Sequence, residues 1–127
     1  MTARQVFTSG QTFTAAQANA LAEATVAVNA QGTATSYTLA LTDAGKLITF
    51  TGAAATVTIP LNSTIALAVG DQINIAQLGT GQVTIGTASG VTLVSSGSKT
   101  KTNGQYAVAT VVQYTANSWL LLGNIST

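Results

Sequence analysis

From Tyr37 to the end of the chain, apolar and polar side chains alternate with a period of two. The run Thr56 to Ile59, TVTI, is typical, because β-branched residues occupy every position. Such alternation is the signature of a strand with one face in a core and the other in water. Turn-forming residues separate the runs, for example at Asp43-Ala44-Gly45, Gly70-Asp71 and Asn103-Gly104. The pattern predicts about eight or nine short strands.

Short strands at this spacing predict a mainly β fold, either an antiparallel β-sandwich or a jelly roll or barrel. Asn103-Gly104 is the strongest hairpin signal in the chain. Gly79-Thr80-Gly81 is interpreted as a second tight hairpin connection and not as a phosphate cradle, because no GK[ST] follows it. We place the β domain at residues 36–124, and no sustained internal repeat is visible in it.

The front of the chain follows a different pattern. Residues 1–13 resemble an arm, and residues 14–31 an alanine-rich helix with Thr14 as N-cap and Gly32 after its end. Ordering a backbone costs about 1–2 kcal/mol per residue, and this helix has few large apolar side chains to offset that cost. We therefore expect residues 1–31 to serve in attachment or oligomerisation. The alternative is a plain helix that lies on its own β domain.

Two features predict contacts between copies of the chain. One side of the predicted helix repeats at the four-and-three spacing of a heptad seam. Residues 105–115 have apolar side chains on both faces, so either a second subunit or a segment of the same chain is expected to cover them. The predicted oligomer contacts are Ala18, Leu21, Thr25, Val28 and Val111.

Charge is sparse in this chain. Charged residues make up 6% of the sequence, against about 25% in an ordinary soluble domain. A net charge of +1 gives no electrostatic reason to expect nucleic acid or an anionic membrane as a partner. The N-terminus lacks the apolar stretch of a signal peptide, and no apolar run approaches the roughly 20 residues that span a bilayer.

The residue types also bear on chemistry. Without His or Cys, the usual zinc sets and thiol chemistry are excluded, and a general base would have to be a carboxylate or a lysine. Glu23, Asp43 and Asp71 lie far apart, and the two aspartates at glycine-containing turns are expected to bond turn amides. Trp119 is expected to be a core or interface anchor more than a sugar-stacking residue. We predict no catalytic, metal or cofactor site.

Five segments of the β domain form a recognisable set. They are Thr58-Ile59-Pro60, Gly70 to Ile73 (GDQI), Gln77 to Ile85 (QLGTGQVTI), Gly104 to Ala107 (GQYA) and Trp119 to Gly123 (WLLLG). Together these segments resemble a domain of phage tail-fibre, head-fibre and capsid-decoration proteins. The leader segment Gly10 to Leu21 (GQTFTAAQANAL) resembles the N-terminal end of phage fibre and minor tail proteins. The resemblance implies a homotrimer with its N-terminal part on the particle and its β domain outward.

The leading hypothesis from this resemblance is a capsid decoration, or head-fibre, protein of the virion that is assembled in the host cytoplasm and bound to the major capsid protein. The alternative is a tail-fibre or receptor-binding tip that recognises host cell-wall glycan. A glycan-cleaving enzyme is a third hypothesis, and it would require paired carboxylates facing one cleft. The predicted capsid-anchoring residues are Arg4, Val6, Phe7 and Phe13.

Overall fold

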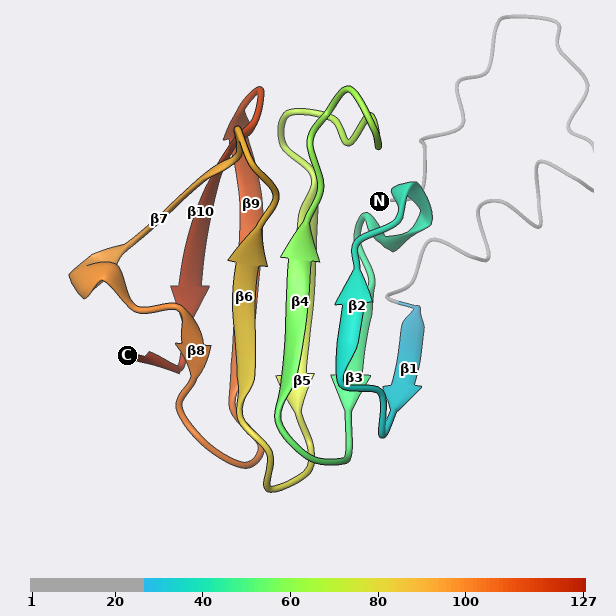
Figure 1. The fold of residues 1–127 in the computed structure, drawn as a ribbon, viewed down its shortest axis with the longest axis vertical. Helices are drawn as coiled ribbons and strands as arrows, with labels where there is room; N and C mark the ends of the chain where they lie inside the picture. Colours follow the sequence, from blue (N-terminus) through green and yellow to red (C-terminus); the bar gives the residue numbers. More distant parts are fainter. Residues whose placement is uncertain (1–26) are drawn as a thin grey trace, which may run out of the picture.

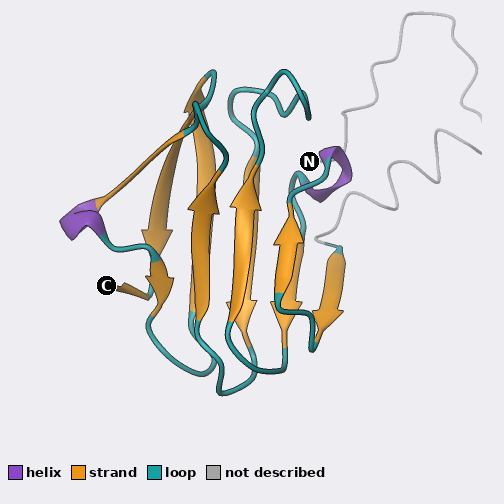
Figure 2. Ribbon diagram, viewed as in Figure 1, coloured by secondary structure: helices purple, strands orange, loops and turns teal. Residues whose placement is uncertain are grey.

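The computed structural model of the chain describes residues 27–127. Within them, eleven strands form two sheets that pack face to face, together with two short 3-10 helices (Figures 1 and 2). The prediction of a mainly β sandwich is confirmed. The strands are β1 (Val28–Gly32), β2 (Ser36–Thr38), β3 (Leu47–Phe50), β4 (Ala55–Ile59), β5 (Gln72–Gln77), β6 (Val83–Thr87), β7 (Thr92–Ser95), β8 (Lys101–Thr102), β9 (Val108–Thr115), β10 (Ser118–Gly123) and β11 (Ile125–Ser126), and the helices are η1 (Leu41–Asp43) and η2 (Ser96–Ser98).

The first six strands form three stacked coils, where a coil is one turn of the chain that adds one strand to each sheet. One sheet has the strand order β1-β3-β5-β9-β10-β7, and the other has the order β11-β8-β6-β4-β2. From β1 to β6, successive strands alternate between the sheets, and β1, β2, β3 and β4 each pair in parallel with the strand two places later. The sheets are therefore mixed, which corrects the expected antiparallel arrangement. Side-chain alternation reports the buried face of a strand and not the direction of its neighbour, so the sequence pattern did not distinguish the two.

The second half of the domain closes the stack with antiparallel strands. β9 runs antiparallel to β5 in one sheet, and β8 runs antiparallel to β6 in the other. β9 and β10 form the hairpin, whose turn places Asn117 at a φ of 59°. The predicted hairpin at Asn103-Gly104 is wrong, because this segment connects β8 and β9, which belong to different sheets.

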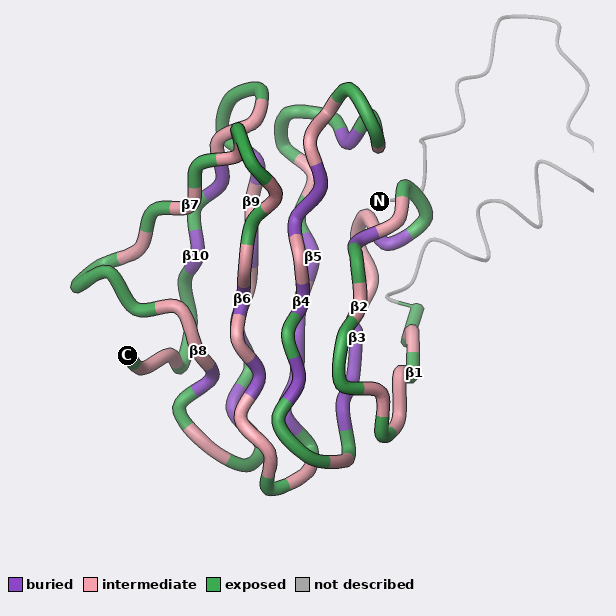
Figure 3. Tube along the Cα trace, viewed as in Figure 1, coloured by how far each residue is buried: buried purple, intermediate pink, exposed green. Residues whose placement is uncertain are grey.

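The core lies between the two sheets and follows the predicted alternation. Ile48, Ile75 and Ala109 occupy neighbouring register positions on one sheet, and Val57 and Ile85 do so on the other. All five are buried, and buried and exposed positions alternate along the strands (Figure 3). Parallel pairing thus stacks the same inward position of successive coils.

Glycine permits two coils to stack closely at the end of the sandwich where β3 passes to β4. A Cβ atom at Gly79 would lie 2.4 Å from the carbonyl oxygen of Thr51, and one at Gly81 would lie 2.0 Å from the carbonyl carbon of Ala53. Neither distance is possible for a real side chain, so the turn between β5 and β6 requires glycine at both positions. The Gly79-Thr80-Gly81 segment is therefore a crossover between sheets and not the hairpin that we predicted.

The chain enters the sandwich earlier than expected. Val28–Gly32 forms β1, which corrects the last residues of the helix predicted over 14–31. β1 pairs in parallel with β3, and this pairing outweighs the weak helix preference of Val28 and Asn29. The predicted residues Arg4, Val6, Phe7, Phe13, Ala18, Leu21 and Thr25 lie outside the described residues.

Candidate interaction surface

The outer face of the five-stranded sheet is lined by hydroxyl groups. Ser36, Thr56 and Thr84 occupy adjacent register positions across β2, β4 and β6, and Lys101 follows on β8. These side chains are exposed or half-buried, while the residues on either side of Thr56 and Thr84 are buried in the core. Short polar side chains in this arrangement suit contact with water, as expected for one face of a half-buried sheet.

The outer face of the six-stranded sheet is apolar where β9 and β10 cross it. Leu120 lies between Val94 on one neighbouring strand and Val112 on the other. Val94, Leu120 and Leu122 are 42%, 41% and 45% exposed. We define the apolar face as Val94, Val108, Val112, Tyr114, Leu120 and Leu122.

This sheet also lacks charge. None of its six strands contains Asp, Glu, Lys or Arg, and Lys101 is the one charged residue within a strand of residues 27–127. In the middle of the face, the Thr110 hydroxyl donates a hydrogen bond to Asn74 Oδ1 at 2.7 Å. A partner that covered the face would find the Thr110 hydroxyl already bonded, with exposed Gln72, the register partner of Val112, beside it. Contiguous exposed apolar patches on soluble proteins commonly mark interaction sites.

The same alternation that builds the core also builds the apolar face. Ala109 and Val111 stand beside Ile75 and Ile73 on the core side of β9, so the residues between them point outward. Val111 is 0% exposed, and its side chain is not available to a second copy. This placement corrects our choice of Val111 as an oligomer contact. The sequence showed that β9 is apolar on both faces, but the prediction placed Val111 on the outward face, where Val112 lies instead.

Val28 remains a candidate for oligomer contact, because it is 61% exposed. It lies on the edge strand β1, and its register partners across the sheet are Leu47, Asn74 and Thr110 in turn. These partners share one outer row with Leu122. Val28 therefore lies at the far edge of the same outer face, and the polar residues Asn74 and Thr110 separate it from Leu122.

Asp43 lies at the end of η1, beside the first coil, and is 0% exposed. Its carboxylate accepts hydrogen bonds from the Ala40 amide at 2.8 Å, from the Tyr37 hydroxyl at 2.6 Å and from Asn29 Nδ2 at 2.9 Å. Burial, and then the hydrogen bond to Asp43, raise the pKa of Tyr37 to about 12. The expected turn-amide bonds are confirmed at Asp43 and also at Asp71, whose carboxylate accepts from the Ala68 amide at 2.8 Å.

These contacts decide what Asp43 can do chemically. A carboxylate that is enclosed and bonded by three donors has no access to a substrate, so Asp43 is a structural residue that ties η1 to β1. The described residues hold no group of three or more side chains of the kinds that bind metal. A small open pocket of about 180 Å³ beside β7 has no titratable side chain in its lining, which consists of Leu93, Val94, Ser95, Ser98 and Thr100.

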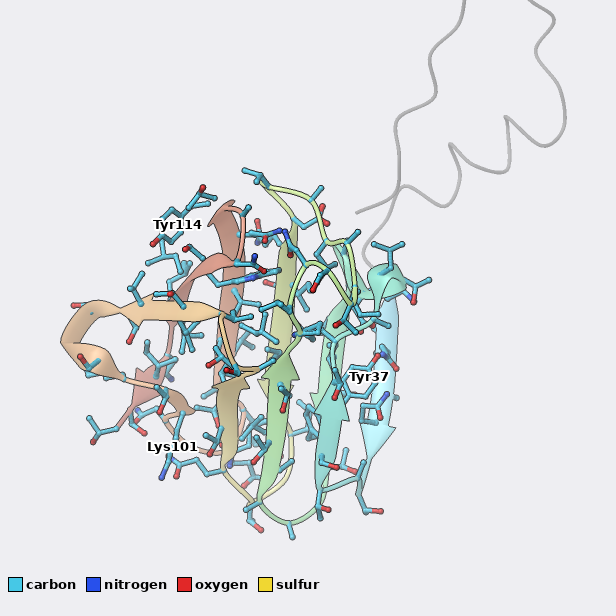
Figure 4. The ribbon with its side chains drawn as sticks, turned by 45° about the horizontal axis from the view of Figure 1, so that its top comes forward. Tyr37, Lys101 and Tyr114 are labelled. Atoms are coloured by element: carbon cyan, nitrogen blue, oxygen red, sulfur yellow. The ribbon has the colours of Figure 1, made fainter. Side chains whose placement is uncertain are left out.

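Trp119 and two tyrosines, Tyr106 and Tyr114, differ in whether they could stack on a sugar. Trp119 is 0% exposed and belongs to the core, which confirms that it is an anchor. Tyr106 and Tyr114 are 72% and 51% exposed. Tyr106 lies just before β9 and Tyr114 near its end. Since a strand rises about 3.3 Å per residue, the two residues are about 20 Å or more apart and cannot stack on one sugar ring. Figure 4 shows Tyr114 and Tyr37 on opposite sides of the sandwich.

Among residues 27–127, no helix has the length and apolar content that crossing a bilayer would need. In comparisons with known protein families and with curated proteins, the chain matches none of them.

Proposed function

We propose that this chain is a structural protein of a phage virion, namely a capsid decoration or head-fibre protein that binds the capsid through its N-terminal arm as a homotrimer. One observation carries the proposal. The sandwich has a hydroxyl-lined outer face and, on the opposite sheet, an uncharged apolar face with leucine and valine side chains 41–45% exposed. A subunit of an assembly, with one face in solvent and the other in contact with protein, is expected to have these two surfaces.

The resemblance of the leader and of the β segments to phage virion proteins supports the same assignment. The described residues begin at β1, which is an edge strand of the six-stranded sheet. An edge strand has one neighbour in its sheet, so attachment through the segment before β1 would not require the core to open. Arg4, Val6, Phe7 and Phe13 are the proposed anchors, with Arg4 paired to a capsid carboxylate and the aromatic rings in pockets.

Deletion of residues 2–13 tests the attachment. The truncated protein is expected to keep the far-UV circular dichroism and unfolding midpoint of the full chain, and to lose co-sedimentation with particles that lack the protein. Undiminished co-sedimentation would contradict the proposed arrangement. The copy number in purified virions places the protein, since a stoichiometry comparable with that of the major capsid protein indicates the head and a small number of copies indicates the tail.

A tail-fibre or receptor-binding tip is the second candidate, and Tyr106 favours it. This residue is 72% exposed and holds a φ of 69°, which is costly for an aromatic residue. An exposed aromatic ring at a fixed turn suits stacking on a sugar. Saturable binding of the isolated protein to host cell walls, lost in Tyr106→Ala and kept in Tyr114→Ala, would establish this function in place of the first.

A further inference from the structure

We infer that the apolar face is the surface through which copies of this chain pack against one another, with β9 and β10 of one copy against β9 and β10 of the next. The inference deepens the proposed function and rests on it in one respect, because that function calls for a homotrimer. It replaces Val111 with the outward residues of the same hairpin as the contact between copies.

The first step is the composition of the face. Leu120 and Val94 are adjacent outward side chains of parallel neighbours, and Leu120 and Val112 are adjacent across the hairpin. Leu122 and Val108, 45% and 41% exposed, continue the face along the two strands of the hairpin. Large apolar side chains of β7, β9 and β10 are thus contiguous, as they are at the core of an interface between subunits.

The second step is charge, which selects a second copy as the occupant. In a homotrimer, the side chains next to the threefold axis meet the same side chains of the other two copies, so a charged residue there would meet its own like. The six-stranded sheet contains no charged residue in any strand. Two copies can therefore approach with no like-charge repulsion, whereas a partner that is recognised by charge would find nothing to pair with.

The third step is complementarity. Apolar side chains are best covered by other apolar side chains, and within residues 27–127 the other outer face is lined by serine and threonine. Of the outer faces that the structure describes, the one that matches the apolar face is therefore the apolar face of another copy. The hydrogen bond of 2.7 Å between Thr110 and Asn74 satisfies the Thr110 hydroxyl and Asn74 Oδ1 within one chain.

Sedimentation equilibrium of the full chain over a range of concentrations tests the inference directly. The wild-type protein is expected to assemble, and Leu120→Lys to sediment as a monomer whose unfolding midpoint equals that of the wild type at concentrations below the assembly range. The matched control is Thr56→Lys on the opposite face, which is also exposed and is expected to assemble like the wild type. A monomeric wild type at every concentration, or a Leu120→Lys variant that assembles normally, would overturn the inference.

A labelling experiment keeps the test valid if Leu120→Lys does not fold. The chain has no cysteine, so Thr110→Cys and Thr84→Cys, both at half-buried outward positions, introduce unique thiols on the two faces. Maleimide labelling at position 110 is expected to slow roughly tenfold as the protein concentration passes through the assembly range, while labelling at position 84 stays constant. A rate at position 110 that does not depend on concentration would overturn the inference, because the face would then be covered by its own chain or left uncovered.

These measurements concern self-association in solution, and deletion of residues 2–13 concerns attachment to particles. Each can fail without the other. A monomer that still attaches through its arm would refute the packing of copies and leave the virion role in place. An assembled protein that does not bind particles would do the reverse.

Discussion

Two glutamine side chains act as internal cross-links of the sandwich. Gln77 is 1% exposed, and its Oε1 accepts a hydrogen bond of 2.6 Å from the Thr102 hydroxyl, which joins the two sheets. Gln113 is 0% exposed. Its Nε2 donates a hydrogen bond to the Leu67 carbonyl at 2.8 Å, and its Oε1 accepts one from the main-chain amide of Asn117 at 3.1 Å. Buried amides with partners on separate segments fix those segments relative to each other.

Gln113→Leu is expected to destabilise the protein. The change leaves the buried Leu67 carbonyl without its partner, which costs about 1–3 kcal/mol, and it also removes the acceptor of the half-buried main-chain amide of Asn117. Urea unfolding measures the loss of free energy. Gln72→Leu is the control, because Gln72 is exposed and its replacement should change stability by no more than about 0.5 kcal/mol. Equal stability of the two variants would contradict the cross-linking role of Gln113.

Trp119 contributes through its volume and not through its polar atom. The ring is 0% exposed, and its Nε1 has no hydrogen-bond partner among the described residues. Trp119→Ala is expected to cost about 3–5 kcal/mol because it leaves a large cavity. Trp119→Phe should cost much less, since it removes an unsatisfied donor together with part of the ring. Guanidinium unfolding of both variants checks the prediction, and similar losses would indicate that the indole nitrogen is bonded.

At the scale of elements, the stacking of coils depends on the turn between β5 and β6. Gly81→Ala is expected to destabilise the protein by about 1–3 kcal/mol or more, because the new Cβ would lie 2.0 Å from the carbonyl carbon of Ala53. Thermal unfolding measures the effect. Gly104→Ala serves as the control, since a Cβ at that position has nothing within 4 Å. A Gly81→Ala variant as stable as Gly104→Ala would mean that the coils do not stack at this turn.

The elements that the sequence predicted well are those with strong alternation. Runs around Ile48, Val57, Ile75 and Ile85 do form strands with these residues inward, since burial of one face is a local property. Pairing is not local. The parallel coils were missed because the register partners Val28, Leu47 and Asn74 are unequally spaced along the chain, so no repeat is visible.

Local signals failed where a distant partner decided the outcome. Asn103-Gly104 favours a hairpin, but the strand that follows is held by β5 in the other sheet. Residues 28–31 continue an alanine-rich pattern, but β3 supplies the backbone partners of a strand. At the candidate surface, the sequence predicted that both faces of β9 are apolar but not which face points outward. Val111 and Val112 are equally apolar neighbours on opposite faces, and pairing with β5 decides which of them is buried.

At the scale of the whole molecule, sparse charge shapes the response to pH. The chain has no histidine and only seven charged side chains, four basic and three acidic. Few groups titrate near neutrality, so the free energy of unfolding is expected to stay nearly constant between about pH 5 and pH 9. Denaturant unfolding at intervals of pH measures it. A steep change within that range would mean that a carboxylate or lysine has an environment different from the one described.

Above that range, Tyr37 makes stability depend on pH. Its pKa is raised from 10.0 to about 12 in the folded protein, by burial first and then by the hydrogen bond to Asp43. As pH rises from 10 toward 12, the unfolded chain loses this proton while the folded chain keeps it. The unfolded state then binds fewer protons, so the free energy of unfolding falls with increasing pH.

Tyr37→Phe should be less stable at neutral pH, because Asp43 loses a donor. Its loss of stability above pH 10 should be shallower than that of the wild type. Every other titratable group is common to both proteins, so the difference between the two curves isolates Tyr37. Parallel curves would show that the phenol is not held neutral by Asp43.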